Sequence, residues 1–221
     1  MLETQTIEVV RVANGCEFVL AHRGDEWVVR VGGKTLMNSR MHYSEQALAD
    51  ESLRRAKEVR TILVGGLGLG FTLRSVLDRA PKDAKVTVAE LVPELVRWNR
   101  THLAGLHNDA LSDPRCEIVT GDVFTLLKRS RAAFDVILLD VDNGPVAMSH
   151  AQNQQLYGER GLRECHAALK PHGILSVWSA SVSPRFERRL FGAGFTVEVL
   201  KVPAYQGSRS KHVLFVGTRT T

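Results

Sequence analysis

The sequence has no long hydrophobic run and no apolar leader. No stretch approaches the roughly 18–20 consecutive apolar residues of a membrane-spanning helix, although 44% of the 221 residues are hydrophobic. Residues 1–6 are polar where a secretory signal peptide would carry its apolar core. We therefore expect no membrane partner and a cytoplasmic location.

Cysteine is also scarce. Cys16, Cys116 and Cys165 are odd in number, lie far apart and lack the short spacing of metal-ligand pairs. This pattern favours separate reduced thiols in or near the core over a disulfide framework or a cysteine metal site. We predict that the protein holds no metal.

The protein is moderately basic, with a net charge of +5 at pH 7. The basic residues are spread out, and their densest groups are 54–57, 128–131 and 185–189. Each group falls on an expected helix or helix end, where a solvated polar face is the usual explanation. A nucleic-acid partner is therefore the less favoured interpretation, although a basic protein can attract acidic partners.

A glycine-rich turn marks the centre of the chain. The apolar run 61–65 ends in Gly66, Gly68 and Gly70, and a helical pattern begins at Phe71. This predicts a buried strand, a tight turn and a helix whose N-terminus faces a ligand. A dinucleotide fingerprint would have its third glycine at position 71, so a nucleoside such as S-adenosylmethionine is favoured over NAD. Alone, such a turn is more often an ordinary strand-to-helix connection.

Strands and helices alternate from residue 60 to about residue 200. This predicts an α/β fold: a doubly wound, mostly parallel seven-stranded Rossmann-like sheet. The last two strands have no helix between them, so they should pair antiparallel. The expected strands are 61–65, 85–90, 116–119, 134–140, 174–178, 195–202 and 212–216, and the expected helices are 45–58, 71–77, 93–98, 123–127, 162–169 and 186–191.

In the N-terminal region, apolar and polar residues alternate with a period of two, which is typical of strands. Residues 6–37 contain three runs of alternating apolar and polar residues separated by turn residues. They predict a small antiparallel β-meander that caps the sheet domain. We expect two domains, the cap at 1–43 and the Rossmann-like domain at 44–221, with Ser44 capping the helix that joins them.

Acidic residues follow successive strands, at the sheet edge where such folds bind ligands. Glu90 comes twenty residues after Gly70, the spacing of a carboxylate that accepts the ribose hydroxyls. Asp122 and the following backbone N–H, at Val123, suit an adenine ring, and Asp140 ends the next strand. Singly, Glu90 and Asp122 fit helix caps and Asp140 fits a solvent-facing strand end. Together they favour an adenosine site.

These motifs resemble the class I S-adenosylmethionine-dependent methyltransferase fold, and within it the spermidine synthase (polyamine aminopropyltransferase) family. The narrower resemblance rests on the meander, on Tyr43-Ser44-Glu45 and on the acidic loop 140–145. It also rests on Pro203-Ala204-Tyr205 followed by Gly207, which resembles the family's Pro-x-Tyr-x-x-Gly pattern. It implies aminopropyl transfer from decarboxylated S-adenosylmethionine to a small polyamine by a homodimer.

The resemblance also implies roles for individual residues. Asp140 would contact the donor and accept or orient the proton of the amine. Tyr43, Glu45 and Asp142 would line the amine tunnel. Tyr157 and Tyr205 would close it.

Two alternatives stay open. Leu67 stands where the family's glycine loop usually carries an acid. Together with the net positive charge of the chain, Leu67 favours a methyltransferase that uses intact S-adenosylmethionine on a small molecule or RNA. In that case Arg40 or Arg74 would pair with the carboxylate of the cofactor. Asn143-Gly144 alters the acidic loop, which motivates a non-catalytic nucleoside-binding homologue.

Overall fold

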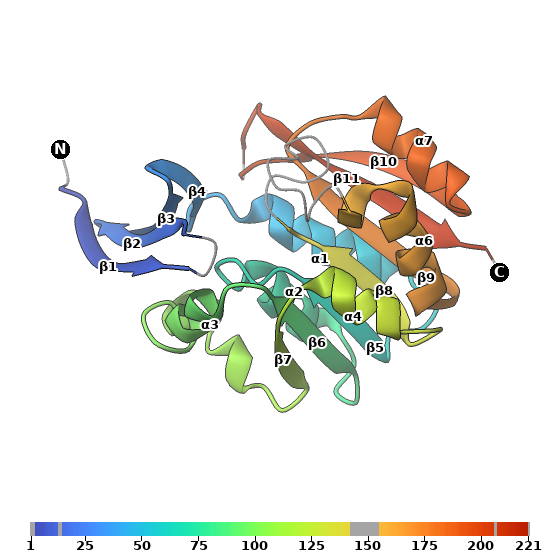
Figure 1. Ribbon diagram of the computed structural model, residues 1–221, viewed down its shortest axis with the longest axis horizontal. Coiled ribbons are helices and arrows are strands. Elements are labelled where there is room, and N and C mark those ends of the chain that lie inside the picture. The colour runs from blue at the N-terminus through green and yellow to red at the C-terminus, as the bar shows by residue number, and fades with distance from the viewer. Residues whose placement is uncertain (1–2, 13–14, 142–154, 206, 221) are drawn as a thin grey trace.

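The protein forms two β-sheets, one small and one large (Figure 1). The structure, a computed structural model, describes residues 3–12, 15–141, 155–205 and 207–220. The small sheet is antiparallel with strand order β1-β2-β3-β4, and the large sheet has order β10-β11-β9-β8-β5-β6-β7. None of the described helices is both long and apolar enough to cross a bilayer.

The elements follow the expected alternation. The strands are β1 (Gln5–Arg11), β2 (Glu17–Arg23), β3 (Glu26–Val31), β4 (Lys34–Asn38), β5 (Thr61–Gly65), β6 (Lys85–Glu90), β7 (Cys116–Thr120), β8 (Phe134–Leu139), β9 (Leu169–Ser179), β10 (Phe195–Pro203) and β11 (Lys211–Arg219). The α-helices are α1 (Tyr43–Arg55), α2 (Phe71–Arg79), α3 (Pro93–Arg100), α4 (Val123–Arg129), α6 (Glu159–Ala168) and α7 (Pro184–Gly192), with short 3-10 helices η1 (Ala104–His107) and η2 (Ala110–Ser112).

The large sheet confirms the predicted fold class. β9, β8, β5, β6 and β7 pair in parallel, and β11 pairs antiparallel with both β9 and β10. Each parallel crossover carries a helix, as parallel strands require a long connection. The strand order reverses direction beside β5, so the C-terminal ends of β5 and β8 form the switch point where such sheets bind ligands.

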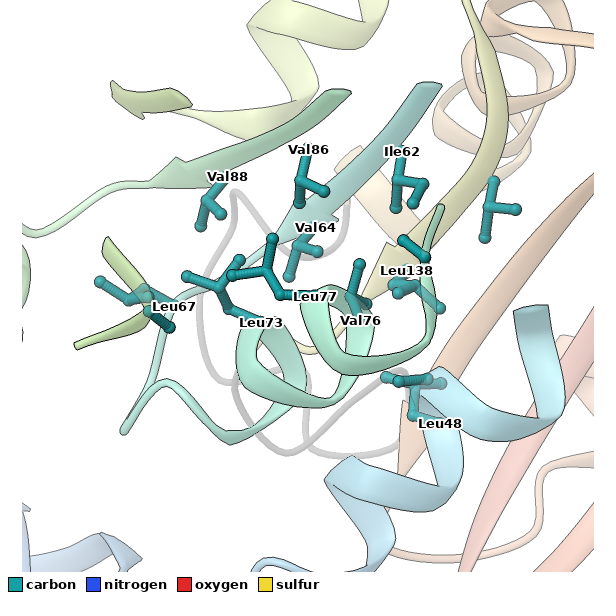
Figure 2. Packing of buried hydrophobic residues seen from close by; sticks show 14 of the residues in the cluster. Leu48, Ile62, Val64, Leu67, Leu73, Val76, Leu77, Val86, Val88 and Leu138 are labelled. Carbon is teal, nitrogen blue, oxygen red and sulfur yellow. The ribbon is translucent and has the colours of Figure 1, made fainter. Parts of the chain in front are cut away.

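Helices cover both faces of this sheet, and the strand residues alternate between them. Ile62 and Val64 belong to the core under α1 and α2, and Leu63 to the core under α4, α6 and α7. Figure 2 shows the first of these cores, with Val76 and Leu77 of α2 directed at the strands. Each fully buried Val, Leu or Ile side chain contributes about 1.5–3 kcal/mol to folding relative to exposure. The apolar faces therefore hold β5 and β8 rigidly beneath the site.

The small sheet packs on the edge of the large domain through its own cluster. Leu20 and Val29 from the cap meet Leu69, Leu95 and Trp98. Polar contacts reinforce the seam, because the indole N–H of Trp98 donates to Glu8 at 2.9 Å. The cap contains four strands rather than the three predicted runs, since Lys34–Asn38 adds β4. The predicted boundary between two domains after residue 43 stays a prediction. In the structure, α1 begins at Tyr43.

Two local predictions are wrong. Ser44 does not cap α1, because the helix begins at Tyr43 with His42 as its N-cap residue and no side-chain capping bond. The strand expected at 174–178 is longer than predicted, because β9 starts at Leu169 and contains Pro171 and Gly173. The ladder between β8 and β9 shifts register at this point, and an irregularity of that kind accommodates proline in a strand.

Candidate active site

The glycine turn after β5 has a backbone that only glycine adopts easily. Gly66 has φ +92° and Gly70 has φ +83°. A Cβ at Gly66 would lie 2.3 Å from the carbonyl oxygen of Asp140, and one at Gly70 would lie 2.4 Å from the ring of His107. Bare backbone is therefore needed at both positions because other chain segments pass directly against the turn. Gly68, with φ +54°, lies between them.

Glu90, at the end of β6, is buried and fixes this turn. One carboxylate oxygen accepts the N–H of Leu67 at 2.8 Å, and the other accepts the N–H of Val92 at 2.8 Å. The carboxylate thus lies against the glycine turn, as the ribose-binding prediction requires. Each carboxylate oxygen can accept more than one hydrogen bond, so this arrangement is compatible with a further hydroxyl donor.

Asp122 acts as a helix cap. Its Oδ1 accepts the N–H of Phe124 at 2.9 Å, which satisfies one of the open donors at the start of α4. Val123 is buried beside the glycine strand, where a Cβ on Gly65 would come within 3.0 Å of its Cγ2. The capping alternative therefore holds for Asp122, and the adenine role of Asp122 and Val123 stays a prediction.

Asp140 follows β8 directly and faces the first turn of α2. Its Oδ2 accepts the hydroxyl of Thr72 at 2.7 Å, and its N–H donates to the carbonyl of Gly65 at 2.8 Å. Burial raises the pKa of Asp140, and the Thr72 hydrogen bond opposes that rise. A carboxylate whose pKa is raised toward neutrality is suited to accept a proton and release it again.

Glu45, in the first turn of α1, lies near Asp140. Burial raises the pKa of Glu45, the negative charge of Asp140 raises it further, and a hydrogen bond from Ser44 opposes the rise. Two neighbouring carboxylates that are partly removed from water do not both ionise readily, so burial and mutual repulsion favour a proton held by the pair. The structure thus brings together two residues that lie 95 positions apart in the sequence.

The three predicted tyrosines occupy different environments. Tyr43 and Tyr205 are exposed. Tyr157 is fully buried, its ring packs edge-on against Phe186 and its hydroxyl donates to the carbonyl of Val141 at 3.2 Å. Tyr157 therefore packs in the core, and its role at the amine tunnel stays a prediction. It anchors the chain just after Asp140. Asp142 lies outside the described residues.

The apolar residue in the glycine turn does not face an open cleft. Leu67 is 3% exposed and packs in the core with Leu73 and Val88 (Figure 2). Its side chain therefore says little about what surrounds a cofactor tail. Leu67 therefore gives no independent support to a methyltransferase, and that alternative stays a prediction.

The two candidate cations for a cofactor carboxylate lie on the other side of α2. Arg74 is two residues from Thr72 and so points about 200° away around the helix. It pairs with Asp78 at 2.7 Å and, with Arg40, lines a cleft of about 970 Å³ between the cap, α1, α2 and η1. Asp140 is absent from that lining, so the structure does not bring Arg40 or Arg74 to the carboxylate pair.

Sequence reasoning missed three polar residues around the carboxylates. Thr72 donates to Asp140 and Ser44 donates to Glu45, while His212 lies one step further away, with its Nδ1 2.9 Å from the hydroxyl of Ser44. Thr72 carried a weak signal as a polar residue on the otherwise apolar face of α2. His212 carried none, because its proximity to Ser44 arises from the packing of β11 beside α1. Among the described residues, no three His, Cys, Asp or Glu side chains form a possible metal site.

Known proteins share this architecture and sequence. Residues 41–191 match the model of the spermine/spermidine synthase domain. Polyamine aminopropyltransferase 2 of Pseudomonas aeruginosa (strain PAO1) is 35% identical over 136 residues, which cover 60% of this chain and 37% of that protein. Polyamine aminopropyltransferase of Aeropyrum pernix is 28% identical over 181 residues, covering 81% of this chain and 53% of that protein.

Solved structures agree on the fold. A spermidine synthase in complex with the transition-state analogue AdoDATO superposes with a TM-score of 0.82 at 19% identity, covering 99% of this chain and 75% of that one. The spermidine synthase of Thermotoga maritima gives 0.79 at 19% identity, covering 99% and 74%. The chain spans about a third to a half of the length of the first two curated relatives that it matches. The family model covers most of the chain, and the protein therefore belongs to the spermine/spermidine synthase family.

Proposed function

We propose that this protein transfers an aminopropyl group from decarboxylated S-adenosylmethionine to a small polyamine, with Asp140 accepting the proton of the attacking amine. The observation that carries the proposal is the Glu45–Asp140 carboxylate pair beside the glycine turn. An acidic, partly buried pair suits an amine that arrives as a cation and must lose a proton before it can react. Methyl transfer to a neutral acceptor has no evident need for such a pair.

The glycine turn and Glu90 would hold the donor. Gly66, Gly68 and Gly70 expose bare backbone at the end of β5, and the Glu90 carboxylate lies against the same turn. Donor ribose hydroxyls would be accepted by Glu90, and the adenine would lie toward Asp122 and Val123. The same arrangement serves intact S-adenosylmethionine, so the donor must be determined by measurement.

The reaction is a displacement at carbon. The amine nitrogen forms a bond to the aminopropyl carbon, the bond from that carbon to the sulfonium breaks, and the sulfur leaves as a neutral thioether. The donor supplies the activated carbon, and Asp140 takes the proton that the amine loses. Holding the two reactants in line supplies much of the rate, since good alignment is worth about 7–11 kcal/mol.

The remaining residues would position the amine. Tyr43 and Glu45 lie together at the start of α1, and Tyr205 is exposed in the turn after β10. We propose that these side chains, with Asp142, line the acceptor site. Tyr157 would act from the core, because its hydroxyl holds the carbonyl of Val141, the residue that follows Asp140.

The direct test incubates the purified protein with decarboxylated S-adenosylmethionine and putrescine and measures methylthioadenosine. Product that depends on the amine, and is lost in Asp140→Asn while donor binding remains, would support the proposal. Intact S-adenosylmethionine serves as the competing donor. Exclusive binding of the intact form, followed by methyl transfer, would identify a methyltransferase instead. Tight nucleoside binding without turnover on any amine would identify a non-catalytic homologue.

We further propose that the protein works as a cytoplasmic homodimer, as the family resemblance implies. Cys116 and Cys165 form no disulfide in the structure, which suits a reducing compartment. Light scattering on the purified protein tests the assembly, and a monomeric mass at working concentration would contradict it. Fractionation of the source cells tests the location.

A further inference from the structure

A chain of hydrogen bonds leads from the carboxylate pair to a histidine on another strand. The hydroxyl of Ser44 donates to Oε2 of Glu45 at 2.8 Å, and Nδ1 of His212 lies 2.9 Å from the same hydroxyl oxygen. Ser44 is fully buried, and His212 is half-buried at the start of β11. Three consecutive groups that can each accept and donate a proton therefore run from the candidate active site toward the surface.

We propose that Ser44 and His212 form the path by which the proton taken from the amine leaves the Glu45–Asp140 pair. The inference rests on the proposed function, since only a reaction that releases a proton at Asp140 needs such a path. Each turnover deposits one proton on a pair that already holds one. The pair must discharge it before the next amine can be deprotonated.

The transfer balances without any further reactant. Protonated Glu45 donates its proton to the oxygen of Ser44, and Ser44 passes its own hydroxyl proton to Nδ1 of neutral His212. The imidazolium then releases its Nε2 proton to water. The resulting state has His212 Nδ1–H donating to Ser44 and Ser44 donating to ionised Glu45, and the structure contains the Ser44-to-Glu45 bond together with a 2.9 Å contact between Nδ1 and the Ser44 oxygen. The proton on Asp140 then moves to Glu45, and proton exchange with water returns the ring to the Nε2–H tautomer, which restores the starting state.

The surroundings of His212 keep its ring neutral and fixed. Trp178 of β9 packs edge-on against it, with ring centroids 4.7 Å apart, and Val202 is its partner on β10. Ser44 is the group that faces it from α1. Burial lowers the pKa of His212, and no described charged group contributes to that shift. A neutral imidazole can accept a proton from Ser44 and pass it on.

The first arm of the test is kinetic. Ser44→Ala and His212→Gln are expected to lower kcat about tenfold or more, as for loss of a proton-transfer group, with the KM for the amine nearly unchanged. The solvent isotope effect on kcat should rise, imidazole in the buffer should restore the rate of His212→Gln, and Ser44→Thr should keep it. His166→Gln is the matched control, since His166 also packs edge-on against an aromatic ring, that of Phe195 at 5.2 Å.

Unchanged kcat in both variants would overturn the path. So would an effect on KM alone, or a loss equal to that of His166→Gln and insensitive to imidazole. These outcomes would assign Ser44 and His212 a binding or structural role.

The second arm does not depend on turnover. Nitrogen NMR of the His212 ring reports which nitrogen carries the proton. The path predicts that the neutral ring changes from the Nε2–H to the Nδ1–H tautomer as Glu45 ionises, and that Glu45→Gln and Ser44→Ala abolish this change. A His212 ring that keeps the same tautomer when Glu45 ionises would contradict the path. If the wild-type protein shows the switch but no aminopropyl transfer, the proposed function fails and the coupling stands.

Discussion

The hydroxyl of Thr72 donates a 2.7 Å hydrogen bond to Oδ2 of Asp140. This contact joins the first turn of α2, just after the glycine turn, to the end of β8. It favours the ionised carboxylate against the effect of burial, which raises the pKa of Asp140. The pH range in which Asp140 can accept a proton therefore depends on a residue outside the acidic motifs.

Replacing Thr72 by Val should raise the pKa of Asp140 further, because the ionised form loses a donor. Asp140 accepts a proton only when ionised, so the limb of the pH–rate profile that rises with pH should move to higher pH. A hydrogen bond to a charged group is worth about 1.5 kcal/mol, so we expect about a tenfold lower rate on that limb. The pH dependence of kcat/KM measures the shift. Thr72→Ser retains the hydroxyl and should behave like the wild type, and an unmoved limb in Thr72→Val would contradict this role.

Replacing Gly66 by Ala should damage both stability and donor binding. The new Cβ would lie 2.3 Å from the main-chain oxygen of Asp140, and its φ of +92° is unfavourable for alanine. Strain at such a backbone and a clash with main chain together predict a loss of about 3 kcal/mol in the free energy of unfolding. Urea denaturation measures this loss. Gly105→Ala is the control, because a Cβ there meets no atom within 4 Å.

Replacing Glu90 by Gln should weaken donor binding. The amide offers one acceptor oxygen, whereas both carboxylate oxygens accept backbone N–H groups, from Leu67 and Val92. One N–H would be left without its partner, at a cost of about 1–3 kcal/mol, which corresponds to about 5- to 150-fold in affinity if the turn no longer forms. Calorimetric titration with methylthioadenosine tests this. Glu117→Gln, exposed on the adjacent strand β7, removes the same charge and should bind normally.

Replacing Asp135 by Asn should destabilise the fold at neutral pH. One carboxylate oxygen of Asp135 accepts the N–H groups of Arg60 and Thr61 at 2.9 and 2.8 Å, and the other pairs with Lys170 at 3.0 Å. Burial alone would raise the pKa of Asp135, but these bonds outweigh it and lower the pKa. Loss of the charge at this buried network should cost about 3 kcal/mol.

The same variant gives a pH test. Because the folded-state pKa of Asp135 is depressed, its contribution is fully present above the unfolded-state value near 3.9 and is lost as pH falls through the folded-state pKa. The difference in unfolding free energy between wild type and Asp135→Asn should therefore shrink in acid. Asp83→Asn, at an exposed position, should show no such difference. A difference that persists at low pH would show that the charge of Asp135 is not its source.

The sequence by itself determined the sheet and the edge at which its acidic residues gather. Alternating apolar strands, the glycine turn and the acids at Glu90 and Asp140 follow from local spacing, because parallel strands place their C-terminal ends at one edge. The N-terminal meander was predicted from its period of two, and only its fourth strand was missed. These features depend on neighbours in sequence, which a linear pattern records.

Tertiary structure alone decided how the acids are connected. Glu45 meets Asp140, and Ser44 meets His212 across 168 positions, because α1 packs against the sheet beside β8, β9 and β11. Packing on the two faces of the sheet likewise places Leu67 in one core and Tyr157 in the other, where its hydroxyl is bonded to the carbonyl of Val141. Side-chain direction depends on what each residue packs against in the folded protein, and that information is absent from spacing along the chain.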